Sequence, residues 1–254
     1  MRFSVRLLSS AAALATVLAL PLTAAAQQIT VSAAASLTDA FKELGPKFEA
    51  SRPGATLRFN FAASGALLQQ IAQGAPVDVF ASADQATMNR ANDQKLIDAD
   101  SRRNFVTNSL VLIEPATGGT GVKSLQDLTG TMVKKIAIGK VATVPVGAYT
   151  KQVLDGAKLW EPLEAKFVQA DSVRQVLDYV GRGEVDAGFV YSTDATIAGD
   201  KVKVVATPSG HTPVSYPVAV VADSKQKDLA KQFAAYLVGD EAQTVFKRFG
   251  FGKP

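Results

Sequence analysis

The sequence contains 254 residues, of which 47% are hydrophobic and 20% are charged, and its formal net charge is +4 at pH 7. These proportions are typical of a folded soluble protein and exclude disordered, collagen-like and coiled-coil chains. The chain has no cysteine and one histidine, His211. That composition excludes a disulfide framework, a thiolate metal site, a cysteine nucleophile and a multi-histidine metal site.

The first 26 residues have the pattern of a secretory signal peptide. Arg2 and Arg6 precede an apolar stretch over 7–22, and the alanines at 24–26 are the small residues that a signal peptidase requires. The apolar stretch is shorter than the ~20 residues of a membrane span. We therefore expect cleavage after Ala26 and export to the periplasm. No clustered basic surface is predicted in the remaining chain, which argues against nucleic-acid binding.

After residue 26, short β-branched segments alternate with helical patterns, which predicts an α/β fold with helices on both faces of a sheet. In chain order, we expect strands over 29–33, 56–62, 78–81, 110–114, 135–139, 165–168, 187–191, 202–206 and 218–222. We expect helices between them over 37–50, 66–73, 85–92, 148–158, 173–181 and 226–249. The last helical pattern is expected to break near 238–240 because it contains Gly239.

No long linker divides the chain, so two domains would have to be joined by short crossings. We place these crossings near 107–110 and 213–216. The first domain then consists of 27–108 and 217–254 and is discontinuous, and the second consists of 109–216.

Four predicted turns between a strand and a helix carry small or hydroxyl residues. They lie at 33–39, 60–66, 145–148 and 171–174. The start of a helix presents unpaired backbone N–H groups and the positive end of the helix dipole, which suits an anion. In an open α/β sheet these turns lie along one edge. The alternative for each serine is a helix cap contributing about 1 kcal/mol.

Seven segments, in the same order, closely resemble the periplasmic molybdate-binding proteins of ABC importers. They are SAAASL at 32–37, FAASG at 61–65, GAPVDVFASAD at 74–84, VPVGAY at 144–149, SVR at 172–174, GFVYSTD at 188–194 and YPVAVV at 216–221. This resemblance implies a type II periplasmic binding protein, with two α/β lobes, a central mixed sheet in each lobe and a ligand cleft between them.

The resemblance also implies which residues bind the oxyanion. Ser36 and Ser64 would donate from their hydroxyl and backbone N–H groups, Val146 and Val173 from backbone N–H groups, and Tyr191 from its phenolic hydroxyl. Members of the family often have alanine at the position of Val146, and a backbone donor is unaffected by that difference.

A site that offers donors alone disfavours a protonated anion, because a hydroxyl on the ligand would need an acceptor. This argues against phosphate and leaves molybdate, tungstate or sulfate, among which the resemblance favours molybdate. Molybdenum would then be present only within the oxyanion, without protein ligands to the metal and without a cofactor. The expected partner is the membrane permease of an ABC importer, and the receptor is expected to be a monomer without catalytic residues.

Two other functions remain open from the residues. An exported hydrolase could use Ser64, but Ser64 lacks the Gly-x-Ser-x-Gly pattern and only His211, in a turn-rich loop, could serve as its base. A metal-ion receptor could use carboxylates and tyrosines such as Asp78, Asp84, Asp186, Asp194 and Tyr191.

Overall fold

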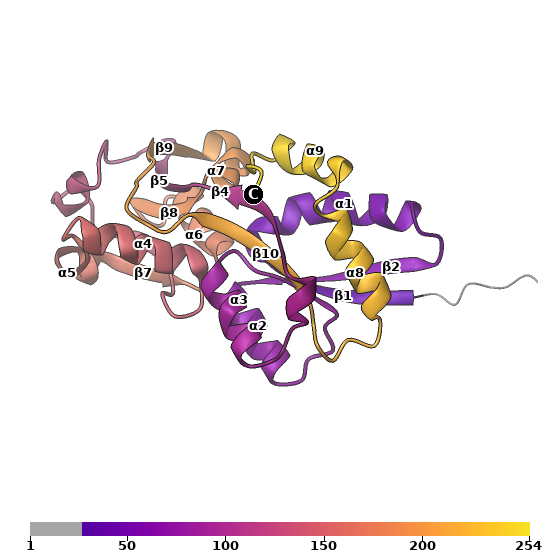
Figure 1. The fold of residues 1–254 in the computed structure, drawn as a ribbon. Helices are drawn as coiled ribbons and strands as arrows, with labels where there is room; N and C mark the ends of the chain where they lie inside the picture. Colours follow the sequence, from indigo (N-terminus) through magenta and orange to yellow (C-terminus); the bar gives the residue numbers. More distant parts are fainter. Residues whose placement is uncertain (1–26) are drawn as a thin grey trace, which may run out of the picture.

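The computed structural model describes residues 27–254, so the predicted signal peptide at 1–26 lies outside the described residues. Two five-stranded mixed sheets lie side by side, each with helices packed around it (Figure 1). In spatial order, the first sheet contains β2 (Ala55–Ala62), β1 (Gln27–Ala34), β3 (Val79–Ala81), β10 (Val214–Val220) and β4 (Arg103–Asn108). The second contains β7 (Phe167–Ala170), β6 (Ile136–Gly139), β8 (Ala187–Tyr191), β5 (Leu110–Pro115) and β9 (Val202–Ala206).

The two sheets are built to the same plan. In the first, β1 pairs in parallel with β2 and β3, and β10 is antiparallel to β3 and β4. In the second, β6 pairs in parallel with β7 and β8, and β5 is antiparallel to β8 and β9. We call the sheets and their helices lobe 1 and lobe 2. The prediction of two α/β lobes with mixed sheets is confirmed.

Helices cover both sheets. In lobe 1 they are α1 (Thr38–Ala50), α2 (Ser64–Ala72), α3 (Gln85–Asp93), α8 (Lys227–Tyr236) and α9 (Asp240–Arg248). In lobe 2 they are α4 (Pro145–Gly156), α5 (Trp160–Leu163), α6 (Val173–Gly181) and α7 (Ser192–Ala198). The expected break in the last helical pattern is confirmed, with Gly239 immediately before α9. No helix within residues 27–254 combines the length and the hydrophobicity needed to cross a membrane.

The chain crosses between the lobes at neighbouring points. It leaves β4 at Asn108 and enters β5 at Leu110 after one residue, and it returns through β10 (Figure 1). Val214 and Tyr216 fall within the range expected for the second domain, but they pair with Asn108 and Val106 of β4 in the first sheet. The return crossing is therefore part of a continuous strand of lobe 1.

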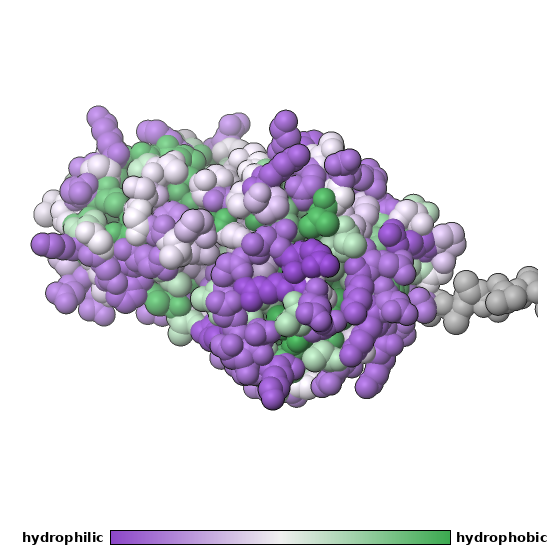
Figure 2. Space-filling model, viewed as in Figure 1, coloured by the Kyte–Doolittle hydropathy of each residue, from purple (hydrophilic) through white to green (hydrophobic). Residues whose placement is uncertain are grey.

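Apolar helix faces pack on both sheets. In lobe 1, Phe41 of α1 is fully buried and packs edge-on against Phe233 of α8, with ring centroids 5.9 Å apart. In lobe 2, Val176 and Val180 of α6 pack so closely on Gly188 that a Cβ there would lie 2.7 Å from Val180 Cγ2. The outer face seen in Figure 2 is mostly hydrophilic, with hydrophobic residues in small separate areas. In each lobe, buried side chains thus pack between the sheet and the helices that cover it.

The sequence patterns missed β4, α5 and α7 and placed two helix starts too late. In β4 only Phe105 and Val106 are buried, because it is an edge strand, so its pattern is weak. The helices predicted at 66–73 and 148–158 begin earlier, at Ser64 and Pro145. These earlier starts place Ser64 and Val146 in the first turns of their helices.

Candidate anion-binding site

A small cavity lies between the lobes at the carboxyl ends of the parallel strands. Twelve residues line it, and all five of the residues predicted to bind an oxyanion are among them. Most of the others are small, namely Ala34, Ala35, Ala62, Ala63 and Ala83. The cavity volume is about 10 Å³, which is close to the room for a single water. Only a compact ligand of a few atoms suits such a space.

Each predicted residue lies where a parallel strand ends. Ser36 follows β1 in the single turn Ala35–Leu37, and Ser64 is the first residue of α2 after β2. Val146 is the second residue of α4, Val173 is the first residue of α6, and Tyr191 is the last residue of β8. The first two come from lobe 1 and the other three from lobe 2. Backbone N–H groups in the first turn of a helix have no partner within the helix, so they are free to face a ligand.

Neither Ser36 nor Ser64 caps its helix, so the alternative that these serines serve as caps is wrong. The Ser36 Oγ lies 3.0 Å from the hydroxyl of Tyr216, and the Ser64 Oγ accepts the backbone N–H of Ala83 at 3.0 Å. Ser172 does cap α6, because its Oγ accepts the N–H of Gln175 at 3.2 Å. The hydroxyls of Ser36 and Ser64 are thus held at the cavity rather than at their helix ends.

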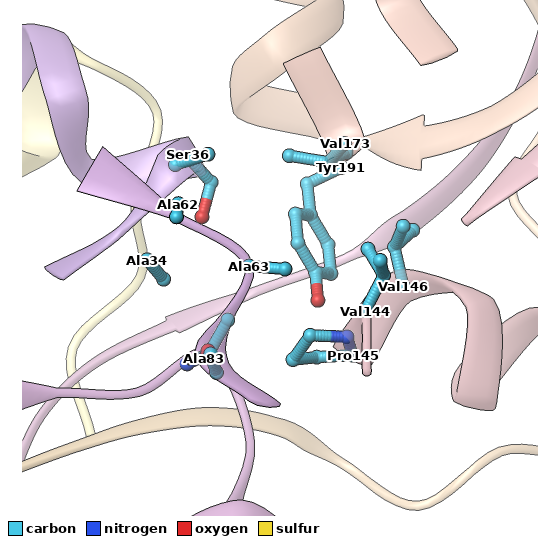
Figure 3. A pocket seen from close by; sticks show the side chains of 12 residues that line it. Ala34, Ser36, Ala62, Ala63, Ala83, Val144, Pro145, Val146, Val173 and Tyr191 are labelled. Carbon is cyan, nitrogen blue, oxygen red and sulfur yellow. Dashed lines mark hydrogen bonds between the residues drawn. The ribbon is translucent and has the colours of Figure 1, made fainter. Parts of the chain in front are cut away.

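The Tyr191 hydroxyl is a donor without a partner. Its ring extends from lobe 2 across the cavity toward Ala63 and Pro145, opposite Ser36 (Figure 3). The side chain is 1% exposed, and its hydroxyl has no hydrogen-bond partner within residues 27–254. Burial raises the pKa of Tyr191 well above its ordinary value, so the hydroxyl keeps its proton at neutral pH. An unpaired buried hydroxyl costs about 1–3 kcal/mol, which a ligand acceptor would recover.

The cation beside the cavity is neutralised by carboxylates. Arg174 follows Val173, and its Nε donates to Asp194 Oδ1 at 2.6 Å while its Nη1 lies 2.7 Å from Asp39 Oδ2. Burial raises the pKa of the Asp194 carboxyl to about 6, against the opposing effect of Arg174. Asp194 is therefore ionised at pH 7, and Arg174 is balanced by two negative charges. The cavity itself offers neutral donors.

The carboxylates considered for a metal site are engaged elsewhere. Asp78 accepts the backbone N–H of Thr30 at 2.8 Å, and Asp186 accepts two backbone N–H groups of the loop before β6. In the part of the chain that the structure describes, no three His, Cys, Asp or Glu side chains are grouped to hold a metal ion. His211 lies in the loop before β10, with its ring centroid 5.6 Å from that of Tyr149.

Direct contacts join the two lobes around the cavity. The backbone N–H of Gly65 in α2 donates to the carbonyl of Thr143 before α4 at 2.9 Å. The Tyr149 hydroxyl of α4 donates to the carbonyl of Ala83 at 3.4 Å. The lobes are thus in a closed arrangement. Gly65 and Tyr149 belong to two of the sequence motifs, but their part in closure was not predicted, because contacts between lobes leave no pattern in the local sequence.

Comparisons with known proteins agree on one family. The model of the family described as bacterial extracellular solute-binding protein matches residues 29–252. The molybdate-binding protein ModA of Escherichia coli is 39% identical over 230 residues, covering 88% of this chain and 88% of that protein. A Bacillus subtilis protein named as a putative ABC transporter substrate-binding lipoprotein, YvgL, is 40% identical over 225 residues, covering 88% of this chain and 85% of its own.

Solved structures show the same fold. The periplasmic molybdate-binding protein of Azotobacter vinelandii superposes with a TM-score of 0.77 at 25% identity, covering 89% of this chain and 99% of that one. The substrate-binding domain of a putative molybdenum ABC transporter from Clostridium difficile gives a TM-score of 0.68 at 40% identity, with coverages of 89% and 99%. The family consists of solute-binding receptors and not of enzymes. This chain belongs to the bacterial extracellular solute-binding proteins and, within them, to the family that contains the molybdate-binding proteins.

Proposed function

We propose that this chain is an extracytoplasmic receptor that binds molybdate, and also tungstate, between its lobes and delivers it to the permease of an ABC importer. The observation that carries this proposal is the convergence of neutral donors from both lobes on one very small cavity. The named relatives that bind molybdate support the choice of ligand. Export through the predicted signal peptide, with cleavage after Ala26, is part of the proposal.

The donors suit a fully ionised tetrahedral anion. Hydrogen bonds to a charged group contribute about 1.5–3 kcal/mol each, so a few aligned donors are sufficient without a net positive charge. We assign the hydroxyls of Ser36, Ser64 and Tyr191 and the backbone N–H groups of Val146 and Val173 to the ligand oxygens. Molybdenum is present only inside the oxyanion, with no cofactor and no protein ligand on the metal.

Ligand capture is proposed to close the two lobes about the crossing strands. We assign 27–108 and 214–254 to lobe 1 and 109–213 to lobe 2, because Val214 and Tyr216 of β10 pair with β4 of the first sheet. A ligand that contacts both lobes stabilises the closed form over the open one, which is the differential affinity that such a change requires. The closed monomer then presents both lobes to the permease.

A calorimetric titration of the ligand-stripped protein lacking residues 1–26 tests the proposal. Molybdate, tungstate, sulfate and phosphate are added separately, and we expect tight 1:1 binding of the first two, much weaker binding of sulfate and the weakest binding of phosphate. Tight binding of sulfate alone would change the assigned ligand, and silence toward all four would overturn the proposal. Hydrolysis of an ester that is lost in Ser64→Ala would contradict the receptor function directly.

A further inference from the structure

A chain of side-chain hydrogen bonds runs from the crossing between the lobes to the cavity. The Asn108 Nδ2 at the end of β4 donates to the hydroxyl of Tyr216 in β10 at 3.2 Å. The Tyr216 hydroxyl lies 3.0 Å from the Ser36 Oγ, which faces the cavity. Tyr216 is fully buried and lies outside the set of residues that line the cavity. The Tyr216 hydroxyl can therefore reach a ligand through Ser36, whereas the Tyr216 ring packs edge-on against Tyr191, with centroids 6.0 Å apart, and keeps that packing in Tyr216→Phe.

The direction of this chain is set by one backbone group. The N–H of Ser109 can only donate, and it donates to the Asn108 Oδ1 at 2.9 Å. The Asn108 oxygen is thereby assigned, so its Nδ2 faces Tyr216 as a donor. The Tyr216 hydroxyl accepts this bond, and its own proton has the Ser36 Oγ as acceptor. If Ser36 donated instead, the Tyr216 proton would have no acceptor within residues 27–254. Ser36 therefore accepts from Tyr216, and its own proton is directed away from Tyr216.

Ser64 is oriented by the same principle. Its Oγ accepts the backbone N–H of Ala83 at 3.0 Å, and a backbone N–H cannot act in reverse. Its proton is therefore also free for the cavity. Both serines have an oxygen occupied by a donor from lobe 1, and both have a proton that remains available. The two serines accept from different residues, Tyr216 and Ala83, but each is left with a hydroxyl proton that can be donated to a ligand.

We propose that Asn108 and Tyr216 are positioning residues that fix Ser36 as a hydrogen-bond donor and thereby set the preference for anions without a proton. This inference rests on the proposed function, because it concerns the same cavity. With one lone pair of the Ser36 Oγ accepting from Tyr216 and its proton directed at the ligand, a ligand hydroxyl facing Ser36 would find no acceptor there, and a buried donor without an acceptor is disfavoured. Without the Tyr216 hydroxyl, Ser36 can turn its lone pair toward the ligand, so a protonated anion such as hydrogen phosphate is no longer rejected there.

A double-mutant cycle tests this role. The variants are Tyr216→Phe, Ser36→Ala and their combination, with Tyr236→Phe as a matched control, because the Tyr236 hydroxyl donates to Glu241 at the exposed surface of lobe 1. Affinities for molybdate, tungstate, sulfate and phosphate are measured by calorimetry at constant pH. We expect Tyr216→Phe to weaken molybdate binding about tenfold and to tighten phosphate binding, so that the ratio between phosphate and molybdate dissociation constants narrows by more than tenfold. In the Ser36→Ala background, Tyr216→Phe should have almost no further effect.

The outcomes separate this inference from the proposed function. If the unsubstituted protein binds none of the four anions, the proposed function and this inference both fail. If it binds molybdate and Tyr216→Phe has the same effect with and without the Ser36 hydroxyl, Tyr216 acts through packing and only this inference fails. Where Ser36→Ala binds too weakly to complete the cycle, the phosphate affinity decides: unchanged or weaker phosphate binding in Tyr216→Phe overturns the inference, and tighter phosphate binding supports it.

Discussion

The two lobes share one strand order, but they prepare their donors differently. Lobe 1 offers the hydroxyls of Ser36 and Ser64, and each has its oxygen occupied by a donor from the same lobe. Lobe 2 offers the hydroxyl of Tyr191, which is buried and has no partner within residues 27–254. The difference indicates that the donors of lobe 1 are already oriented without a ligand, and we call them a preformed half-site. The Tyr191 hydroxyl of lobe 2, in contrast, gains a hydrogen-bond partner only when a ligand lies in the cavity.

This asymmetry gives the closed form a dependence on ligand. Closure without a ligand buries the Tyr191 hydroxyl unpaired at a cost of about 1–3 kcal/mol. A bound oxyanion removes that cost and adds contacts from both lobes. A bound oxyanion therefore shifts the proposed equilibrium between an open and a closed form toward the closed form. Substitutions in either lobe, or between them, should disturb this dependence to different degrees.

Removing both serine hydroxyls eliminates the half-site of lobe 1. In Ser36→Ala combined with Ser64→Ala, two charge-assisted hydrogen bonds of about 1.5–3 kcal/mol each are lost, so molybdate affinity should fall by roughly 10²–10⁴-fold. Neither serine caps a helix, but each accepts a hydrogen bond from a buried donor, so the thermal unfolding midpoint of the ligand-free protein should also fall. Calorimetry and thermal unfolding measure the two effects, and binding at full strength in this variant would show that the half-site is elsewhere.

Removing the unpaired hydroxyl tests lobe 2. Tyr191→Phe should lower molybdate affinity about 10- to 100-fold, because a donor to the anion is lost. The ligand-free protein should be no less stable, since the hydroxyl has no partner among the described residues. Loss of both affinity and ligand-free stability would contradict the unpaired state of Tyr191. Tyr236→Phe, at the surface of lobe 1, is the control and should leave binding unchanged.

The sequence predicted the cavity residues better than the groups that orient them. Ser36, Ser64, Val146 and Val173 each follow a strand near a helix start, and such a pattern is local. Tyr216 contacts Ser36 across 180 positions of sequence. That contact depends on β3 lying between β1 and β10 in the first sheet, and this strand order leaves no pattern in the local sequence.

Charge partners were missed for a similar reason. Arg174 stands in a motif next to Val173, but nothing in the sequence says that it lies between Asp39 and Asp194. These partners come from α1 of lobe 1 and α7 of lobe 2, and α7 itself was not predicted. Its seven residues are rich in threonine and too short to give a helical period. Local patterns thus locate the turns that form the site. Contacts between residues far apart in the sequence determine which groups donate hydrogen bonds, how Arg174 is neutralised and how the lobes meet.

The contact between the lobes can be blocked without touching either half-site. A Cβ on Gly65 would lie 2.7 Å from the Cα and the carbonyl oxygen of Thr143, so Gly65→Ala should hold the lobes apart. Alanine is favoured over glycine inside a helix by about 1 kcal/mol, so lobe 1 should be as stable as before or more so. We expect calorimetry to show molybdate affinity falling about tenfold while the ligand-free unfolding midpoint stays the same or rises.

A second glycine provides the control for this helix effect. Gly156 ends α4, and a Cβ added to it would meet no atom within 4 Å, so Gly156→Ala should leave the affinity unchanged. Equal affinity in Gly65→Ala and the unsubstituted protein would mean that ligand binding does not need the closed contact between Gly65 and Thr143.

The weakest effect is expected from the ion pair between the lobes. Asp39→Asn keeps the size of the side chain but removes the charge that faces Arg174 at 2.7 Å. Both side chains are partly exposed, at 37% and 23%, and such pairs contribute up to about 1 kcal/mol, so molybdate affinity should fall about two- to fivefold.

Salt separates this ion pair from a packing effect. The difference between Asp39→Asn and the unsubstituted protein should shrink as ionic strength rises, because exposed charges are screened. Glu241→Gln is the matched control: it removes a charge from the exposed pair with Lys47, at 3.8 Å, which lies wholly within lobe 1. If both variants weaken binding equally, the charge of Asp39 acts on the anion as part of the general field of lobe 1. If only Asp39→Asn weakens binding, and does so mainly at low salt, the ion pair between Asp39 of lobe 1 and Arg174 of lobe 2 stabilises the closed contact between the lobes.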